Sequence, residues 1–108
     1  MIIAEITVIP IGTKTASVSK YIARAVDELK KLGLEPELTA MGTIFEADDI
    51  SLVLNAFKAM HESVFEQGAV RVVTTLAIDE RRDKVGTIKQ KVQSVVSAKK
   101  SAQAKNST

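Results

Sequence analysis

Four polar side chains that could bind a ligand lie in two mostly apolar segments of this 108-residue chain. Glu5 and Thr7 lie in the first of these segments, and Arg71 and Thr75 lie in the last. A carboxylate, a guanidinium and two hydroxyls on neighbouring strands can bind a small polar ligand through charge and hydrogen bonds. The same residues can also form a structural salt bridge between Glu5 and Arg71, because an unpaired guanidinium on a central strand is costly. The sequence leaves both interpretations open and favours the salt bridge for Arg71.

The residues that enzymes use for covalent or metal chemistry are scarce in this sequence. It has no cysteine, which excludes a thiolate metal site and a cysteine nucleophile. Its single histidine, His61, lies on or beside the apolar side of a predicted helix, so we expect it to be half-buried and hydrogen-bonded. No glycine-rich phosphate loop and no nucleophile elbow occurs. We therefore expect no enzymatic activity, no metal and no cofactor.

Length and composition indicate one soluble globular domain, with 45% apolar and 26% charged residues. We expect a folded domain over residues 1–98 and a disordered basic tail over residues 99–108. The net charge of +2 arises from Lys99, Lys100 and Lys105 in that tail, and a nearly neutral body is poor evidence for nucleic-acid binding. No apolar run approaches the ~20 residues that cross a membrane. We expect a cytoplasmic protein with no nucleic-acid or membrane partner.

Hydrophobic periodicity predicts four strands and three helices. The strands are expected at residues 2–9, 34–41, 43–46 and 70–78, and the helices from about Ser17 to Gly33, from Asp48 or Asp49 to Gly68, and from about Lys84, with Val85 as its first apolar residue, to Ala98. This order predicts an α+β, ferredoxin-like βαββαβ fold. It has a four-stranded antiparallel sheet, with the strands at residues 2–9 and 70–78 expected in the centre and two helices on one face, plus a C-terminal helix.

Two helices can cover only one face of such a sheet. The covered face is expected to carry Ile2, Ala4, Ile6 and Val8 with Val70, Val72, Leu76 and Ile78. The other face then carries Ile3, Glu5, Thr7 and Ile9 with Arg71, Val73, Thr75 and Ala77. Each large apolar side chain left in water forgoes roughly 1.5–3 kcal/mol of burial. We therefore expect the C-terminal helix, the sheet of another subunit or a small ligand to cover this face, and we predict a homo-oligomer.

Several short motifs of the sequence occur together in a known family. They are Pro10-Ile11-Gly12, Ser17-Val18-Ser19-Lys20-Tyr21-Ile22-Ala23, Met41-Gly42-Thr43-Ile44-Phe45-Glu46, Gly68-Ala69-Val70-Arg71-Val72 and Ile78-Asp79-Glu80-Arg81-Arg82-Asp83. Over residues 2–98 the chain resembles the small thiamine-binding protein family, formerly classed as a domain of unknown function. Ala40 and Ala47 depart from it, because the family often has Pro and Gly there. The resemblance implies ferredoxin-like subunits that form dimers and tetramers.

The resemblance also implies a ligand, thiamine or its hydroxymethylpyrimidine precursor. The candidate ligand-binding residues are Glu5, Thr7, Ser19, Thr43, Phe45, Glu46, Arg71 and Thr75. A carboxylate suits the thiazolium or the aminopyrimidine, the hydroxyls suit the pyrimidine edge, and Phe45 offers a ring for stacking. Glu46 can instead cap or pair locally, and Ser19 can be an ordinary exposed helix residue.

These observations predict a non-enzymatic binding protein for thiamine or a hydroxymethylpyrimidine precursor, acting as a homo-oligomer. Its expected partners are further copies of itself, as a dimer or tetramer, and the small ligand. The alternative is a structural or regulatory oligomeric module with no small ligand. A third and weaker interpretation is an enzyme of thiamine or pyrimidine salvage.

Overall fold

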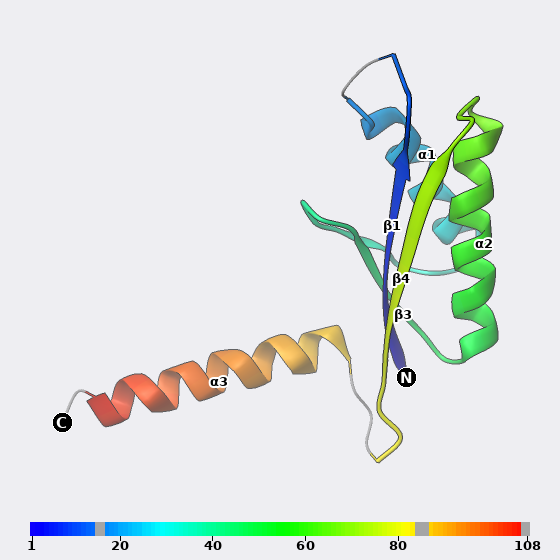
Figure 1. Cartoon of the computed structure of the whole chain (residues 1–108). Coiled ribbons are helices and arrows are strands. Elements are labelled where there is room, and N and C mark those ends of the chain that lie inside the picture. Colours follow the sequence, from blue (N-terminus) through cyan, green and yellow to red (C-terminus); the bar gives the residue numbers. More distant parts are fainter. Residues whose placement is uncertain (15–16, 84–86, 107–108) are drawn as a thin grey trace.

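The computed structural model describes residues 1–14, 17–83 and 87–106. Its elements are β1 (Ile2–Pro10), α1 (Ser19–Lys31), β2 (Glu37–Leu38), β3 (Thr43–Ala47), α2 (Ile50–Glu66), β4 (Val72–Glu80) and α3 (Ile88–Asn106). The strands form one antiparallel sheet, α1 and α2 lie on one face of it, and α3 extends away from the rest (Figure 1). Within the described ranges, each helix is too short or too polar to cross a membrane.

The strand order is β2-β3-β1-β4, so β1 and β3 are the central strands. The prediction that the last strand is central is wrong, because β4 lies at an edge and pairs only with β1 in the described sheet. β1 pairs with β4 over all nine of its residues. It pairs with β3 only as far as Ile6, which lies opposite Thr43. This topology confirms the ferredoxin-like arrangement, with two helices on one face and a further C-terminal helix.

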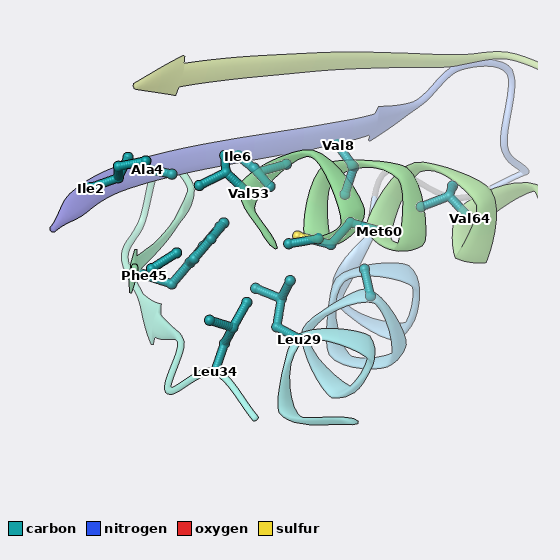
Figure 2. Packing of buried hydrophobic residues seen from close by; sticks show 13 residues of the cluster. Ile2, Ala4, Ile6, Val8, Leu29, Leu34, Phe45, Val53, Met60 and Val64 are labelled. Carbon is teal, nitrogen blue, oxygen red and sulfur yellow. The ribbon is translucent and has the colours of Figure 1, made fainter. Parts of the chain in front are cut away.

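The core lies between the sheet and the two covering helices. Alternate residues of β1, namely Ile2, Ala4, Ile6 and Val8, are all buried. Figure 2 shows Ile6 of β1, Phe45 of β3 and Met60 of α2 pointing into the same interior, where each is at most 1% exposed. The period of two in β1 and the helical spacing of the apolar residues in α2 thus put their apolar sides against each other, as predicted.

Local signals account for the helix ends. Asp49, one of the two predicted N-caps of α2, accepts a hydrogen bond from the backbone N–H of Leu52 at 2.9 Å. Gly68 follows α2 and adopts a φ of +100°, a conformation that favours glycine. The predicted cap of α1 is wrong, because the helix begins at Ser19 with Val18 as its N-cap and without a side-chain cap. The hydroxyl of Ser17 instead lies 3.3 Å from that of Ser19.

Two strands differ in length from their predictions. The second strand is only Glu37–Leu38, rather than residues 34–41, and both of its residues are exposed. Pro36 precedes it directly and has no N–H to donate to a sheet ladder. The last strand runs to Glu80 instead of ending at Ile78, because β1 pairs with it as far as Ile2.

The sheet face opposite the helices is open within the part of the chain that the structure describes. The exposed fractions of Ile9 and Val73, which pair across β1 and β4 on this face, are 50% and 44%. We call this surface the open face. On the helix side, Ile78 and Val70 were expected to be core residues, but they are 43% and 87% exposed. Ile78 belongs to an edge strand, and Val70 precedes that strand, so neither lies between the sheet and the helices.

The C-terminal helix does not lie flat across the open face. α3 begins beside the sheet and leads away from it (Figure 1). It extends to Asn106, whereas composition predicts a disordered tail from residue 99; alanine, lysine and glutamine favour a helix there. The predicted start of this helix at Lys84 and its first apolar residue, Val85, lie outside the described residues.

Candidate functional site

A pocket of about 450 Å³ lies where the β2–β3 hairpin parts from β1. Residues 6–9 of β1 and residues 38–43 of the hairpin line it, together with Val18 and Ile22 at the start of α1. This volume lies in the range of small-molecule sites, which is roughly 300–1,000 Å³. Most of the lining side chains are apolar, so the pocket offers apolar walls to a ring system.

Unequal strand pairing creates this pocket. β1 continues to Pro10 alongside β4, while the ladder between β1 and β3 stops at Ile6 and Thr43. The chain then reaches the hairpin turn, which leaves residues 7–10 of β1 with a paired strand on one side only among the described residues. A ligand in the pocket therefore meets the edge of β1 as well as side chains.

The hairpin turn is held in shape by Thr39. Its backbone N–H and its hydroxyl both donate to the carbonyl of Gly42, each at 2.9 Å. The same hydroxyl accepts from the N–H groups of Met41, at 3.2 Å, and Gly42, at 3.0 Å. Four hydrogen bonds within four residues make this wall of the pocket a defined turn, although Met41 itself is 82% exposed.

The turn lies tightly against two side chains of β1. A Cβ atom on Gly42 would come within 2.9 Å of Thr7 Cγ2 and 3.2 Å of Glu5 Cγ. Cβ atoms essentially never approach heavy atoms that closely, so only glycine fits here without a shift. Gly42 thus brings the hairpin onto the open face beside Glu5 and Thr7.

The side chain of Glu5 lies against this turn, with its Cδ atom 3.3 Å from the position of a Cβ on Gly42, although Glu5 does not itself line the pocket. It lies half-buried on β1, opposite Ala77 of β4 and Ile44 of β3. Among the residues that the structure describes, the Glu5 carboxylate has no hydrogen-bond or ion-pair partner. A half-buried carboxylate beside an apolar pocket is suited to a cation or to a ring N–H donor.

Two of the three predicted threonines, Thr7 and Thr75, share the sheet face of this carboxylate, and Thr43 lies on the other face. Thr7 and Thr43 both line the pocket, and Thr43 is 2% exposed. Thr75 lies directly opposite Thr7 on β4, exposed on the open face and outside the pocket lining. The structure therefore brings Glu5, Thr7 and Thr75 together on the open face, whereas Thr43 lies opposite Ile6 with its side chain buried on the helix side of the sheet.

Arg71 is not part of this region, and its predicted pairing with Glu5 is wrong. Its carbonyl accepts from the N–H of Ile11 at 2.8 Å, so Arg71 lies beyond the end of β1. Glu5 lies opposite Ala77, six residues along the chain from Arg71. At ~3.3 Å per strand residue, that places the two about 20 Å apart along the sheet. Arg71 is exposed and needs no buried counter-ion.

Phe45 and Glu46 have structural roles in place of the predicted ligand contacts. Phe45 is 0% exposed in the hydrophobic core, so its ring offers no free face to a ligand (Figure 2). Glu46 points to the opposite side of β3, where one carboxylate oxygen accepts from the backbone N–H of Ile88 at 2.6 Å. It therefore caps the start of α3, which is the local alternative that the sequence left open.

Ser19 lies close to the pocket without lining it. It is exposed in the first turn of α1, while its neighbours Val18 and Ile22 form part of the pocket wall. Sequence reasoning missed these two residues and also Leu38 and Met41 of the hairpin. One feature of the sequence could have indicated them. Met41 is an apolar residue next to Gly42 in a turn, where polar residues are usual.

His61 is occupied away from the pocket, on the side of the sheet that α2 covers. Its ring nitrogen Nδ1 lies 2.7 Å from the hydroxyl of Thr74, and its ring meets Phe65 edge-on at a centroid distance of 5.1 Å. It is half-buried, as expected. In the described part of the chain, no group of three or more His, Cys, Asp or Glu side chains is arranged to hold a metal ion.

Together these features define a small ferredoxin-like domain. One sheet face is open, and a hydroxyl-bearing apolar pocket of small-molecule size lies at the edge of its first strand. The chain belongs to the thiamine-binding protein family, whose model matches residues 4–96.

Curated relatives agree with this assignment over nearly their whole length. A UPF0045 protein from Methanothermobacter thermautotrophicus is 50% identical over 95 residues, which cover 88% of this chain and 96% of the relative. The UPF0045 protein YqgV from Bacillus subtilis is 41% identical over 99 residues, covering 88% and 94%.

Solved structures share the fold. A hypothetical protein from Methanocaldococcus jannaschii superimposes with a TM-score of 0.79 at 45% identity, covering 87% of this chain and 94% of that one. A Thermotoga maritima protein, whose given name refers to thiamine biosynthesis or salvage, has a TM-score of 0.72 at 24% identity. It covers 87% of this chain and 97% of its own, and at that identity it shows the fold alone.

Proposed function

We propose that this protein binds thiamine or a hydroxymethylpyrimidine precursor in the pocket between β1, α1 and the hairpin, without turnover. The observation that carries the proposal is the half-buried carboxylate of Glu5, which has no partner among the described residues and lies against Gly42 in the wall of an apolar pocket of about 450 Å³. The name of the family and that of the Thermotoga maritima neighbour support this class of ligand.

The chemistry of the ligand matches these groups. Thiamine carries a permanent positive charge on its thiazolium ring and a hydrogen-bonding edge on its aminopyrimidine ring. The carboxylate of Glu5 balances the charge or accepts from the amino group, and charge-assisted hydrogen bonds are roughly twice as strong as neutral ones. The hydroxyl of Thr7 bonds the pyrimidine edge, while Val18, Leu38 and other apolar side chains of the pocket wall cover the ring faces.

The binding unit in this proposal is a homo-oligomer in the cytoplasm. Ile9 and Val73 lie exposed next to each other on the open face, and a second copy packed on this face removes them from water. Burial of each such side chain contributes roughly 1.5–3 kcal/mol. The same packing encloses Glu5 and Thr75 and turns the open side of the pocket into a seam between subunits. We propose a dimer or tetramer on this basis.

A module without a small ligand is the second candidate function. The exposed apolar residues of the open face favour assembly by themselves, whether or not the pocket is occupied. The two candidates differ in one measurable property, which is the heat of binding of thiamine or hydroxymethylpyrimidine to the purified protein.

Isothermal titration calorimetry with each compound tests the proposal. We expect saturable binding of at least one compound and a matching rise in melting temperature. Glu5→Gln is expected to weaken the binding while the oligomer keeps its mass, and Glu62→Gln, at an exposed position on α2, serves as the matched control. Absence of heat and of a melting shift with both compounds contradicts the proposed function and leaves the ligand-free module.

A further inference from the structure

Helix α3 is an arm that projects from an otherwise compact body (Figure 1). Its 19 residues extend about 28 Å at 1.5 Å each. The radius of gyration is 17.0 Å, whereas a compact chain of this length has about 13 Å. Two contacts tie the base of the arm to the sheet, the Glu46 carboxylate to the N–H of Ile88 and the Lys91 ammonium to Asp79.

The arm carries an apolar stripe that is half-buried only at its base, at Ile88, and is exposed beyond it within the described residues. Ile88, Val92 and Val95 recur at the spacing of one helix side, and Val92 and Val95 are 59% and 68% exposed. Valine is a weak helix former, and isolated helices of this length are marginal in water. A helix with this sequence gains most of its stability from a packing partner.

Charge is divided sharply between the arm and the body. Residues 88–106 contain five lysines and no acidic residue. Residues 1–83 contain nine basic and thirteen acidic residues, which gives a net charge of −4. The surface that the arm complements best is therefore the body of this same chain, and an apolar stripe of valines suits a protein surface better than a phosphate backbone.

A groove of matching character lies at the base of the arm. It has a volume of about 310 Å³, and Leu34 and Leu52 contribute apolar side chains to its lining. Its acidic lining comes from Glu35, Glu37 and Asp48, all exposed, and from Glu46, which is half-buried and accepts from Ile88. We call this the base groove. Lys99 and Lys100 lie on the same helix about 17 Å from Ile88, so a straight α3 keeps them away from the base groove of their own chain.

We propose that the arms of two copies pack antiparallel about a two-fold axis, with Lys99 and Lys100 of each arm in the base groove of the other copy. The register is self-consistent. If Lys99 of one arm lies level with residue 88 of the other, Val92 lies opposite Val95 across the axis. Each contact then occurs twice, as a two-fold interface requires. This interface involves neither the pocket nor its ligand, so it does not rest on the proposed function.

Reciprocal charge reversal tests the arrangement. One variant carries Lys99→Glu and Lys100→Glu, and the other carries Glu35→Lys and Glu37→Lys. Each variant alone sets like charges against each other at both ends of the interface. We expect each to show a smaller mass than the wild type by light scattering, with a dissociation constant raised by about tenfold or more. An equimolar mixture pairs opposite charges at both ends and is expected to recover the wild-type mass.

The equimolar mixture distinguishes loss of a specific interface from unfolding of the variants and from non-specific effects of charge. A variant that fails to fold cannot be rescued by mixing, and circular dichroism identifies it. The control Lys30→Glu with Lys58→Glu changes the charge equally on α1 and α2 and is expected to leave the mass unchanged. The proposal would be overturned by a monomeric wild-type protein or by equal masses for all variants. It would also be overturned if the variants bound nucleic acid more weakly than the wild type while their mass stayed the same.

A disulfide test gives the register directly, because the natural chain has no cysteine. Under mild oxidation, a Val92→Cys chain mixed with a Val95→Cys chain is expected to form the mixed covalent dimer faster than either chain forms its own. Equal rates, or no covalent dimer at all, contradict the antiparallel register. Thiamine binding to the charge-reversal variants is measured in a separate titration. A loss of the arm interface can therefore be distinguished from a loss of ligand binding.

Discussion

Gly42 lies so close to Thr7 that a Cβ atom at position 42 would be 2.9 Å from Thr7 Cγ2. This contact brings the β2–β3 turn against β1 and beside Glu5. It therefore determines the shape of the pocket wall. It also explains why a glycine is required at a position where its backbone φ is not positive.

Replacing Gly42 with alanine is expected to move the turn away from β1. The forced shift costs roughly 1–3 kcal/mol of folding stability and lowers thiamine affinity as well. Melting temperature and titration calorimetry measure the two effects. The control is Gly33→Ala, where φ is +80° and no atom lies within 4 Å of the added Cβ. It is expected to cost roughly 1–2 kcal/mol and to leave affinity unchanged. If both variants bound thiamine equally well, the hairpin would not contribute to the binding site.

Replacing Glu5 with glutamine removes the charge and keeps the shape. We expect thiamine affinity to fall about tenfold, which corresponds to about 1.4 kcal/mol. Binding of neutral hydroxymethylpyrimidine is expected to fall less, because its ring carries no fixed charge. Calorimetry with both compounds measures this difference. An equal loss for both, or none for either, would mean that Glu5 does not meet the thiazolium.

Replacing Arg71 with glutamine is expected to change little. The guanidinium is exposed and lies about 20 Å from Glu5 along the sheet, so stability should stay within about 0.5 kcal/mol of the wild type. Thiamine affinity should remain the same. Thermal melting measures the stability, and calorimetry measures the affinity. A tenfold weaker affinity for thiamine would show that Arg71 takes part in binding.

Glu46 and Asp49 cap different helices, and their substitutions should differ accordingly. Asp49→Ala removes the cap of α2, a core helix, and is expected to lower global stability by about 1 kcal/mol. Glu46→Ala removes the hydrogen bond to Ile88 at the base of the arm. Amides near residue 88 should then exchange faster with solvent while the global melting temperature changes little. Hydrogen exchange read by mass spectrometry distinguishes the two, and unchanged exchange in α3 would show that Glu46 does not hold the arm.

The sequence predicts the order of the elements and most of the core, because both follow from periodicity, but it does not predict that β4 is an edge strand. Every second residue from 2 to 8 is an apolar core residue, and α2 has its apolar residues at helical spacing. Asp49 occupies the N-cap position of α2. The folded protein keeps these local patterns because they place the apolar side chains in the core.

The site residues were harder to predict, since register and strand face depend on pairing partners far away in sequence. The predicted Glu5–Arg71 pair is wrong because the register of β1 and β4 places Glu5 opposite Ala77. Arg71 lies level with Ile11, whose N–H donates to the Arg71 carbonyl beyond the end of β1. Phe45 and Glu46 are adjacent, and the pleat sends one into the core and the other towards α3. The pocket itself arises where the β1–β3 ladder stops, and no residue type marks that point in the sequence.

The most direct test of the central claim is a nuclear magnetic resonance titration of the isotopically labelled protein with thiamine. Binding in the proposed pocket predicts concentration-dependent shifts of the backbone amides of Thr7, Val18, Met41, Gly42 and Thr43, with the amides of α2 near Glu62 unmoved. A spectrum that does not change at saturating thiamine, or shifts confined to residues remote from this pocket, would contradict the account.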